Sequence, residues 1–330
     1  MDDIRKGAEA PVSPHKYSNY QVNITDTFYD PEPIVKQGDR SIVSRGNIAA
    51  ITGKSKSFKT FLTSAIAAAF LEDECLSLSG PGGKVLFIDT EQSKSHCNIV
   101  QKRIYRLCGW DQDKISERLI YLSLRELNAE ERLEIVKEAI KDISPDLVII
   151  DGIRDLINDF NDIGESSGVI TLLMSLSTEK NCGIVTVLHQ NKSDNNARGH
   201  LGTELCNKSE TVLQVAREDG IATVSPVFSR NQEIEPFSFR IGVDGLPEGC
   251  LIPKDEHRKE ELRTLMQQAM SGSSVWTKKN LIERVAEVDG RSSRTARRKV
   301  DEAIQEGILT LNKVGHLYIK TEDYDDFPTF

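Results

Sequence analysis

The sequence has 330 residues, of which 38% are hydrophobic and 28% charged, and its formal net charge is −9. This length suggests one large domain or two unequal domains, and the negative charge argues against a surface that coats nucleic acid throughout. No apolar run approaches the roughly 20 residues of a membrane span, and the acidic start Met1-Asp-Asp-Ile is no secretory signal. We therefore expect a cytoplasmic protein without a membrane partner.

Residues 1–44 are polar, contain four prolines and show no sustained hydrophobic period. This pattern predicts an extended N-terminal arm that leads into the core.

The six cysteines of the chain are scattered without a C-x-x-C motif, and we expect them to have no disulfide or metal-binding role.

Residues 45–253 alternate between apolar segments of strand length and segments with helical periodicity, which predicts an α/β domain with a mostly parallel sheet covered by helices on both faces. Ligands of such sheets bind beyond the carboxyl ends of the strands. The predicted strands are Ile48–Thr52, Lys84–Asp89, Leu119–Leu124, Leu147–Asp151, Gly183–His189, Thr211–Val215 and Ile221–Val227. The predicted helices are Lys59–Leu71, Lys94–Leu107, Ala129–Lys141 and Ser166–Lys180.

The stretch between the first predicted strand and the first predicted helix resembles a phosphate-binding loop. Such a loop needs a glycine after the strand, a lysine that reaches the terminal phosphates, and a hydroxyl group for Mg²⁺. Gly53, Lys59 and Thr60 fill these three places. The residues between them, which we expect to surround the phosphates, are Lys54, Ser55, Lys56, Ser57 and Phe58.

Phe58 stands where the usual pattern of the loop has a glycine. Glycine allows the closest backbone approach without strain, but a phenylalanine is compatible with the loop if its φ stays negative and its ring points away from the phosphates. We therefore expect weaker or slower nucleotide binding than in a loop with glycine. Lys54 and Lys56 either add attraction for the phosphates or are simply solvated.

Polar side chains follow three of the predicted strands. Asp89-Thr90-Glu91 ends the second strand, Asp151 ends the fourth, and His189-Gln190 ends the fifth. Each has an ordinary alternative: Asp151 could cap a turn, Glu91 could be a solvated carboxylate, and His189 could be a core histidine. Their joint occurrence behind Lys59 and Thr60 favours a nucleotide site.

The order of these motifs resembles the RecA-type ATPase core. The stretch His189-Gln-Asn-Lys192, followed by Ala197-Arg-Gly-His-Leu-Gly-Thr203, is similar to the plasmid RepA branch of hexameric replicative helicases, and the resemblance covers about residues 34–247. It implies ATP and Mg²⁺ as cofactors and a hexameric ring of identical chains. The implied roles are phosphate and Mg²⁺ binding for Lys59 and Thr60, the general base for Glu91, the metal shell for Asp151, and γ-phosphate sensing for Gln190 or His189.

The same resemblance implies residues that act across subunits or on DNA. Arg230, in Phe228-Ser-Arg-Asn231, is the first candidate for an arginine finger that acts on the neighbouring subunit, and Arg198 is the second. Lys192 lies in a polar stretch that corresponds to a loop facing the ring channel, where a lysine would meet the DNA backbone. The alternatives are ordinary surface arginines and a solvated loop.

Residues 254–320 change to a pattern of three helices followed by a strand pair, with thirteen Lys and Arg against eight Asp and Glu between residues 257 and 320. This pattern resembles a winged helix domain, and the basic excess favours DNA over a protein-docking role. The helices are expected at Glu256–Met270, Lys278–Val288 and from Ser292 or Ser293 to about Glu306, and the strands at Ile308–Leu311 and His316–Lys320. The predicted DNA contacts are Arg294, Arg297, Arg298 and Lys313.

Residues 321–330 carry four acids, no base and a terminal Phe330. They resemble the acidic tails with which single-stranded-DNA-binding proteins recruit partners. Three interpretations stay open: a tail that binds a replication partner, a tail that folds back on the basic helix, and a disordered solubilising end.

Together these features predict an ATP-dependent enzyme that acts on DNA, either a replicative helicase or a translocating accessory factor of a plasmid or mobile element. The alternative is a DNA-binding regulator that uses the nucleotide as a switch and does not translocate. A third interpretation, a scaffold without ATPase activity, depends on the effect of Phe58.

Overall fold

The computed structural model describes residues 17, 20–27, 31–190, 199–251, 253–271, 276–311 and 316–319. The chain divides into two units, Met1–Glu32 and Pro33–Phe330. In the described part of the first unit, the backbone N–H of Asn23 donates to Asp26 Oδ2 at 2.8 Å and the backbone N–H of Asp26 donates to Asn23 O at 2.9 Å. These bonds form a local turn.

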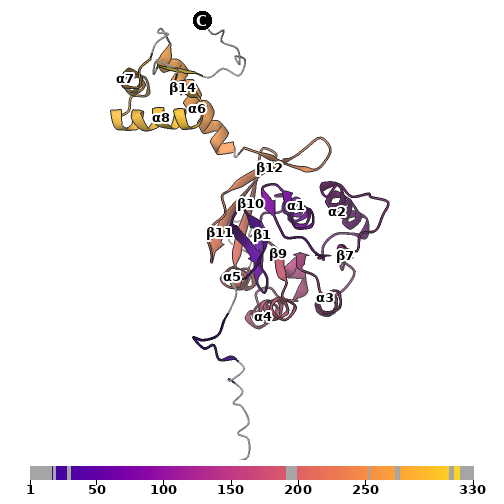
Figure 1. Cartoon of the computed structure of the whole chain (residues 1–330). Helices are drawn as coiled ribbons and strands as arrows, with labels where there is room; N and C mark the ends of the chain where they lie inside the picture. The colour runs from indigo at the N-terminus through magenta and orange to yellow at the C-terminus, as the bar shows by residue number, and fades with distance from the viewer. Residues whose placement is uncertain are drawn as a thin grey trace, which may run out of the picture. The chain divides into compact units, whose positions relative to one another are not determined.

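The second unit is built around a sheet that has nine strands within the described residues (Figure 1). Their order is β13-β12-β11-β10-β3-β9-β8-β6-β7. The strands from β10 to β7 pair in parallel, and β10 to β13 form antiparallel pairs at the other end. The bounds are β3 Ile48–Gly53, β6 Val85–Asp89, β7 Leu119–Ser123, β8 Leu147–Asp151, β9 Gly183–His189, β10 Thr211–Glu218, β11 Ile221–Ser229, β12 Phe237–Ile241 and β13 Pro247–Cys250.

Helices cover both faces of this sheet because the buried strands are apolar on both sides. Along β3, Ala49 and Ile51 pack into the cluster that holds α1 and α2, whereas Ile48 and Ala50 pack into the cluster that holds α3, α4 and α5. This alternation follows from the period of two in a strand. The helices are α1 Lys59–Leu71, α2 Lys94–Leu107, α3 Ala129–Ile143, α4 Ile163–Lys180 and α5 Gly199–Lys208, with a 3-10 helix η2 at Ile153–Leu156.

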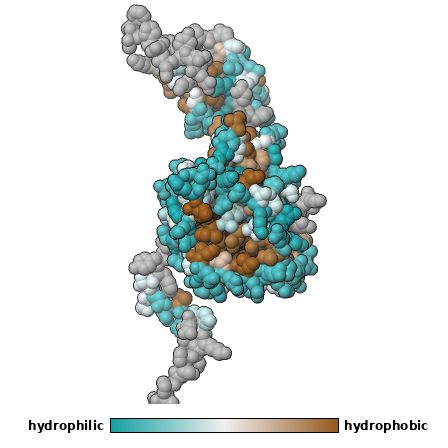
Figure 2. All heavy atoms as spheres, turned by 90° about the vertical axis from the view of Figure 1, so that its right-hand side faces the viewer, coloured by the Kyte–Doolittle hydropathy of each residue, from teal (hydrophilic) through white to brown (hydrophobic). Residues whose placement is uncertain are grey.

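Strand β7 ends the sheet among the described residues. Leu119 is buried, and the other four residues of β7 are half-buried. Figure 2 looks at the side of the molecule on which α2, β7 and α3 lie in Figure 1, and it shows apolar side chains gathered on this face.

The prediction of an extended arm was wrong for residues 33–44. Strands β1 (Pro33–Gln37) and β2 (Arg40–Ser44) pair antiparallel, and Ile34, Val35, Ile42 and Val43 are at most 1% exposed in the same cluster as α1. Two five-residue strands are too short to produce a sustained period, so the sequence pattern missed them. Together with β4 Glu74–Cys75 and β5 Leu78–Ser79 they form a sheet in the order β2-β1-β5-β4.

The predicted strands and helices of the α/β domain are confirmed with small shifts of their ends, whereas α5 and the β12–β13 hairpin were not predicted. Gly199, at the start of α5, has φ +69°, and a Cβ there would lie 2.5 Å from Phe160 Cδ2. The start of α5 therefore depends on a glycine and on a contact distant in sequence, which a local pattern does not show.

The C-terminal part contains the three predicted helices and the strand pair, with a small core of its own. Leu262, Met266, Leu281, Val285 and Val300 are among its buried residues. Trp276 forms an isolated antiparallel bridge to Leu317. The bounds are α6 Pro253–Met270, α7 Lys278–Asp289, α8 Ser293–Gln305, β14 Leu309–Leu311 and β15 Leu317–Ile319. Lys313 and the predicted tail 321–330 lie outside the described residues.

A search of the described helices finds none whose length and hydrophobicity would allow it to cross a membrane.

The buried hairpin predicts that Ile34→Ala destabilises the protein by roughly 2–5 kcal/mol, the usual cost of removing a buried isoleucine side chain. Urea denaturation measures this loss. Ile24→Ala is the matched control, because Ile24 is 103% exposed whereas Ile34 is 0% exposed. Equal and small effects of the two substitutions would show that β1 and β2 do not belong to the core.

Candidate functional site

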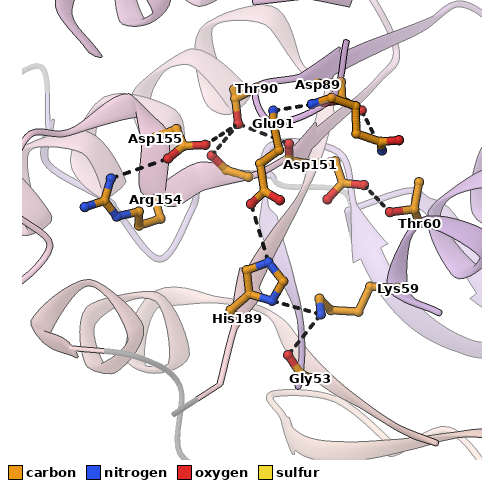
Figure 3. A network of polar contacts seen from close by, with 12 residues as sticks. Gly53, Lys59, Thr60, Asp89, Thr90, Glu91, Asp151, Arg154, Asp155 and His189 are labelled. Atoms are coloured by element: carbon orange, nitrogen blue, oxygen red, sulfur yellow. Dashed lines mark hydrogen bonds and ion pairs between the residues drawn. The ribbon is translucent and has the colours of Figure 1, made fainter. Parts of the chain in front are cut away.

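The register of the parallel strands brings the predicted site residues to one edge of the sheet. Gly53 on β3 lies opposite His189 on β9, and Asp89 on β6 lies opposite Asp151 on β8. The side chains that follow these strands meet in one network of polar contacts (Figure 3). The structure therefore brings together the three strand ends and the loop that the sequence indicated.

Lys59 is the buried cation of this network, with 6% exposure. Its Nζ donates to the backbone oxygens of Gly53 at 3.0 Å and Lys54 at 2.8 Å, and lies 3.2 Å from His189 Nδ1 (Figure 3). Burial lowers the pKa of Lys59 to about 8, although the carboxylates of Asp151 and Glu91 act in the opposite direction. The ammonium group therefore rests on three neutral acceptors, which an anionic ligand could replace.

His189 links Lys59 to Glu91. Its Nε2 lies 3.4 Å from Glu91 Oε1, and its Nδ1 faces Lys59. A neutral imidazole with its proton on Nε2 satisfies both contacts, since it donates to the carboxylate and accepts from the ammonium. The hydrogen bond from His189 is the main reason why the pKa of Glu91 is lowered, and the positive charges of Lys59 and Arg154 act in the same direction, against the effect of burial. Glu91 is therefore held as a carboxylate.

Thr60 and Asp151 form the second part of the site. Thr60 Oγ1 donates to Asp151 Oδ2 at 2.8 Å, and Asp151 is buried. Burial raises the pKa of Asp151 to about 6, while the hydrogen bond from Thr60 acts in the opposite direction. A hydroxyl group beside a carboxylate is a suitable pair of oxygens for a hard cation.

The described residues contain no cluster of three or more His, Cys, Asp or Glu that could hold a metal ion. A cation at Thr60 and Asp151 would therefore take its remaining ligands from water and from a bound phosphate. Mg²⁺ is usually bound in this way, through one or two protein oxygens, several waters and substrate phosphates. The donor set at these two residues fits Mg²⁺ together with a nucleotide.

Asp89 is a site residue at a predicted strand end to which the sequence pattern assigned no role. Its carboxylate is buried and accepts hydrogen bonds from the backbone N–H groups of Glu91 at 3.0 Å and Gln92 at 2.7 Å, and from the Tyr121 hydroxyl at 3.3 Å. Burial raises its pKa, and the two backbone bonds act against this. Asp89 thus fixes the turn that presents Glu91. The sequence did contain a signal for this turn. An aspartate at a strand end can accept hydrogen bonds from the backbone N–H groups two and three residues later, as Asp89 does from Glu91 and Gln92.

Phe58 adopts the left-handed conformation, with φ 70° and ψ 23°. The condition of a negative φ, under which the sequence made a phenylalanine compatible with the loop, is therefore not met. This conformation explains why the usual pattern has glycine here. The ring packs against Phe61, with centroids 5.4 Å apart, and against Phe239 at 6.5 Å, and the Arg217 guanidinium lies 4.0 Å from its centroid. These contacts hold the strained backbone in place.

Gly53 is required for a different reason, since its φ is ordinary. A Cβ at this position would lie 2.5 Å from Val215 O and 2.7 Å from Ser57 Oγ. The loop therefore leaves β3 through a gap that admits no side chain. Ser57 Oγ is itself buried and has no hydrogen-bond partner within the described residues, so the loop holds an unused polar group.

Two cavities adjoin the loop. A cavity of about 320 Å³ contains the catalytic candidates, and its lining consists of Lys56, Ser57, Phe58, Lys59, Thr60, Phe61, Glu91, Gln92, Val100, Arg103, Asp151 and His189. The second, of about 590 Å³, is lined by Lys54, Ser55, Lys56, Ser57, Gln190, Gln214, Val215, Ala216, Arg217, Asp219 and Gly220. Gln190 thus faces the second cavity, whereas His189 faces the first.

Arg230 lies apart from this network. Its Nη2 donates to Lys208 O at 2.9 Å at the end of α5, and its backbone N–H donates to Glu210 O at 2.8 Å. The side chain is exposed. The second finger candidate, Arg198, and the predicted channel residue Lys192 lie outside the described residues.

Three arginines of α8 form no ion pair among the described residues, whereas Lys299 of the same helix does. Arg294, Arg297 and Arg298 contact no carboxylate there. The described carboxylates instead pair with lysines: Asp301 with Lys278 at 2.6 Å, Glu306 with Lys259 at 2.6 Å, and Asp289 with Lys299 at 2.9 Å.

Comparison with known proteins adds one finding. A sequence model of the family described as AAA domain matches residues 21–195, which is more than half of the 330 residues. The match contains β1, β2, the loop before α1, and the ends of β6, β8 and β9. No curated protein matches the chain.

The left-handed backbone of Phe58 predicts an unusual order of stability between two variants. Phe58→Gly and Phe58→Ala both lose the ring contacts, but only glycine removes the strain, so Phe58→Gly should be more stable by about 1 kcal/mol. Thermal or urea unfolding of the two proteins measures the difference. If Phe58→Ala is the more stable variant, the left-handed conformation does not occur in solution.

Proposed function

The chain belongs to the AAA domain family of P-loop ATPases, and from this premise we propose that it hydrolyses ATP and uses the reaction to act on DNA. The observation that carries the proposal is the Lys59–His189–Glu91 chain of contacts beside the Thr60–Asp151 pair. A phosphate-binding cation, a metal-binding oxygen pair and an ionised base are the groups that ATP hydrolysis needs.

Lys59 binds the terminal phosphates in this proposal. Its ammonium group exchanges the carbonyl oxygens of Gly53 and Lys54 for phosphate oxygens, and the backbone of residues 53–58 surrounds the phosphate chain. Thr60 and Asp151 hold Mg²⁺, which neutralises phosphate charge when bound. The neutral acceptors around Lys59 make this exchange favourable, since a charge-assisted hydrogen bond is stronger than a neutral one.

Glu91 acts as the general base that accepts a proton from the attacking water. The hydrogen bond from His189 keeps it ionised and fixes its orientation. His189 contacts both Glu91 and Lys59, so a phosphate that draws Lys59 away also changes the contacts of His189. Gln190 is the next residue in the sequence and lines the second cavity. In this proposal a shift of His189 displaces Gln190 and, through the chain, residues 191–198.

Hydrolysis takes place between subunits of a homo-oligomer in this proposal, as in the hexameric replicative helicases that the motifs resemble. Arg230 is the first candidate for a finger in trans, because the residue is exposed and its guanidinium is held, among the described residues, only by backbone oxygens of α5. Arg198 is the second candidate. The motifs of about residues 34–247 resemble the plasmid RepA branch, and a replicative helicase or translocating factor of a mobile element is the corresponding activity.

The C-terminal part supplies DNA contacts as a winged helix domain. Three helices, the strand pair β14–β15 and the bridge between Trp276 and Leu317 support this assignment. The unpaired arginines at 294, 297 and 298 would bind phosphates or base edges along α8. Lys313 would contact the DNA backbone beside them, Lys192 would contact DNA in the ring channel, and the acidic residues 321–330 would bind a replication partner.

Nucleotide affinity should fall at alkaline pH, with Lys59 as the cause. The protonated ammonium binds phosphate and its pKa is about 8 in the free protein. Binding is therefore fully present below pH 8 and should weaken by up to about tenfold per pH unit above it, until the pKa of the bound state is reached. Titration calorimetry between pH 7 and pH 9.5 measures this change. Lys59→Arg is the matched variant, because its guanidinium stays protonated, and its affinity should be flat over this range.

The function is tested by the ATPase rate with no DNA, with single-stranded DNA and with duplex DNA, alongside the mass of the assembly with ATP. We expect single-stranded DNA to increase the ATPase rate, and we expect the protein to assemble into a ring with ATP. Glu91→Gln should lose about 10²–10⁴-fold in rate, the usual contribution of a general base, while it still binds ATP.

Replacing Arg294, Arg297 and Arg298 together by alanine should weaken DNA binding and reduce its salt dependence.

Two results would contradict the proposal. A monomer or dimer that binds a specific duplex site with negligible stimulated hydrolysis would favour the nucleotide-switched regulator. A folded wild-type protein that does not bind ATP would leave only the scaffold interpretation.

A further inference from the structure

Arg103 on α2 has no place in the catalytic network, yet it lines the same cavity as Lys59 and Thr60. Its guanidinium lies 3.7 Å from the centre of the Phe61 ring, and its Nη1 donates to Ser64 Oγ at 3.3 Å. Both contacts come from α1, the helix that follows the phosphate loop. Arg103 is thus fixed against the first two turns of α1.

The charge of Arg103 is not balanced by a carboxylate among the described residues. Two other arginines of the α/β domain differ: Arg118 also lies near an aromatic ring, that of Trp110 at 5.5 Å, but pairs with Glu72 at 2.8 Å. Arg106, one turn beyond Arg103 on α2, pairs with Asp244 at 3.5 Å. Burial lowers the pKa of Arg103, and the nearby positive charge of Arg106 acts in the same direction. A half-buried cation without an anion, at the wall of a cavity, is an incomplete arrangement that an anionic ligand would complete.

The contacts of Arg103 with α1 indicate which part of a nucleotide it faces. The terminal phosphates lie near Lys59 and Glu91 in the proposed function, on which this inference rests. Phe61 and Ser64 lie further along α1, so Arg103 stands beyond the phosphate loop on the side of α1 that faces α2. We propose that Arg103 binds the nucleotide at the α-phosphate, the end of the phosphate chain next to the ribose.

The guanidinium group suits this role. It presents several N–H donors in a planar fork, which matches two phosphate oxygens, while its face stays on the Phe61 ring. Ser64 and Phe61 hold the fork before the ligand arrives, so little side-chain freedom is lost on binding. Because the α-phosphate is present in both ATP and ADP, Arg103 stabilises both complexes, whereas Glu91 acts only in hydrolysis.

Arg217 is the alternative candidate for binding the nucleotide, at the second cavity. Its guanidinium lies 4.0 Å from the centre of the Phe58 ring, its Nη1 donates to Lys56 O at 3.3 Å, and it lines the second cavity. Two arginines are therefore stacked on two phenylalanines of the loop and α1, one at each cavity. Arg103 is the better candidate because its cavity also contains Thr60, Asp151 and Glu91.

The test compares the affinities of wild-type protein, Arg103→Met, Arg103→Lys and Arg217→Ala for Mg²⁺-ATP and Mg²⁺-ADP by titration calorimetry. Methionine keeps a long apolar side chain on Phe61, so the packing of α1 on α2 is retained. Lys102→Ala is the matched control, because Lys102 is the neighbouring cation of α2 and is exposed. The melting temperature without nucleotide shows whether each variant is folded.

We expect Arg103→Met to weaken the binding of ATP and ADP alike by about 10- to 100-fold, the range for loss of a charge-assisted hydrogen bond. Its KM should rise with little change in kcat, Arg103→Lys should recover part of the affinity, and Lys102→Ala should bind as the wild type does. A merely structural role predicts a lower melting temperature with an unchanged nucleotide-induced shift, and that result would overturn the inference.

A second result would also overturn it: Arg103→Met binds both nucleotides normally while Arg217→Ala does not, which places the nucleotide in the second cavity. Failure of the proposed function looks different, since the wild-type protein itself would then bind neither ATP nor ADP.

Discussion

Parallel pairing of β3, β9, β8 and β6 in one register is the constraint on which the site depends. It sets Gly53 opposite His189 and Asp89 opposite Asp151, so pairs of residues that are 136 and 62 positions apart in the sequence reach the same edge. A slip of one residue would turn each of these side chains to the other face of the sheet. The apolar faces prevent such a slip, because both are buried under helices. The packing of the core thus fixes the chemistry at its edge.

Burial also determines how the charges at this edge behave. Lys59 has a lowered pKa and Asp151 a raised one, both mainly because they lie out of water. Glu91 differs, since a hydrogen bond from His189 outweighs its burial. Glu91 is therefore held as a carboxylate, whereas Asp151, the proposed metal ligand, is a carboxylate whose ionised form is disfavoured by burial. A nucleotide with its cation would relieve the cost of burying each of them.

Phe58 shows how a departure from a sequence pattern is accommodated. The loop imposes a left-handed conformation at this position, which costs a residue with a side chain roughly 1–2 kcal/mol. Packing of the ring on Phe61 and Phe239, with Arg217 over its face, offsets that cost. The loop keeps its shape, and the aromatic side chain ties it to the antiparallel end of the sheet. Phe58 thus links the loop to β12 through its contact with Phe239.

The sequence was sufficient for the features that depend on local pattern. The buried strands, the helices between them and the meeting of Lys59, Thr60, Glu91 and Asp151 at one edge of the sheet were predicted, because apolar period and strand ends are visible in a single chain. The roles of these four residues stay predictions. The sequence was insufficient for features that are determined by contacts between residues distant in the sequence. The hairpin of residues 33–44, the positive φ of Phe58, the turn fixed by Asp89 and the stack of Arg103 on Phe61 each depend on a partner that no local window contains.

The most direct measurement of the central claim is a crystal structure of the wild-type protein with Mg²⁺ and a non-hydrolysable ATP analogue. The account predicts one nucleotide per chain, with Lys59 Nζ moved from the oxygens of Gly53 and Lys54 to the terminal phosphates and with the metal beside Thr60 and Asp151. An analogue bound elsewhere, or a loop with Lys59 still on its own carbonyl oxygens at saturating analogue, would contradict it.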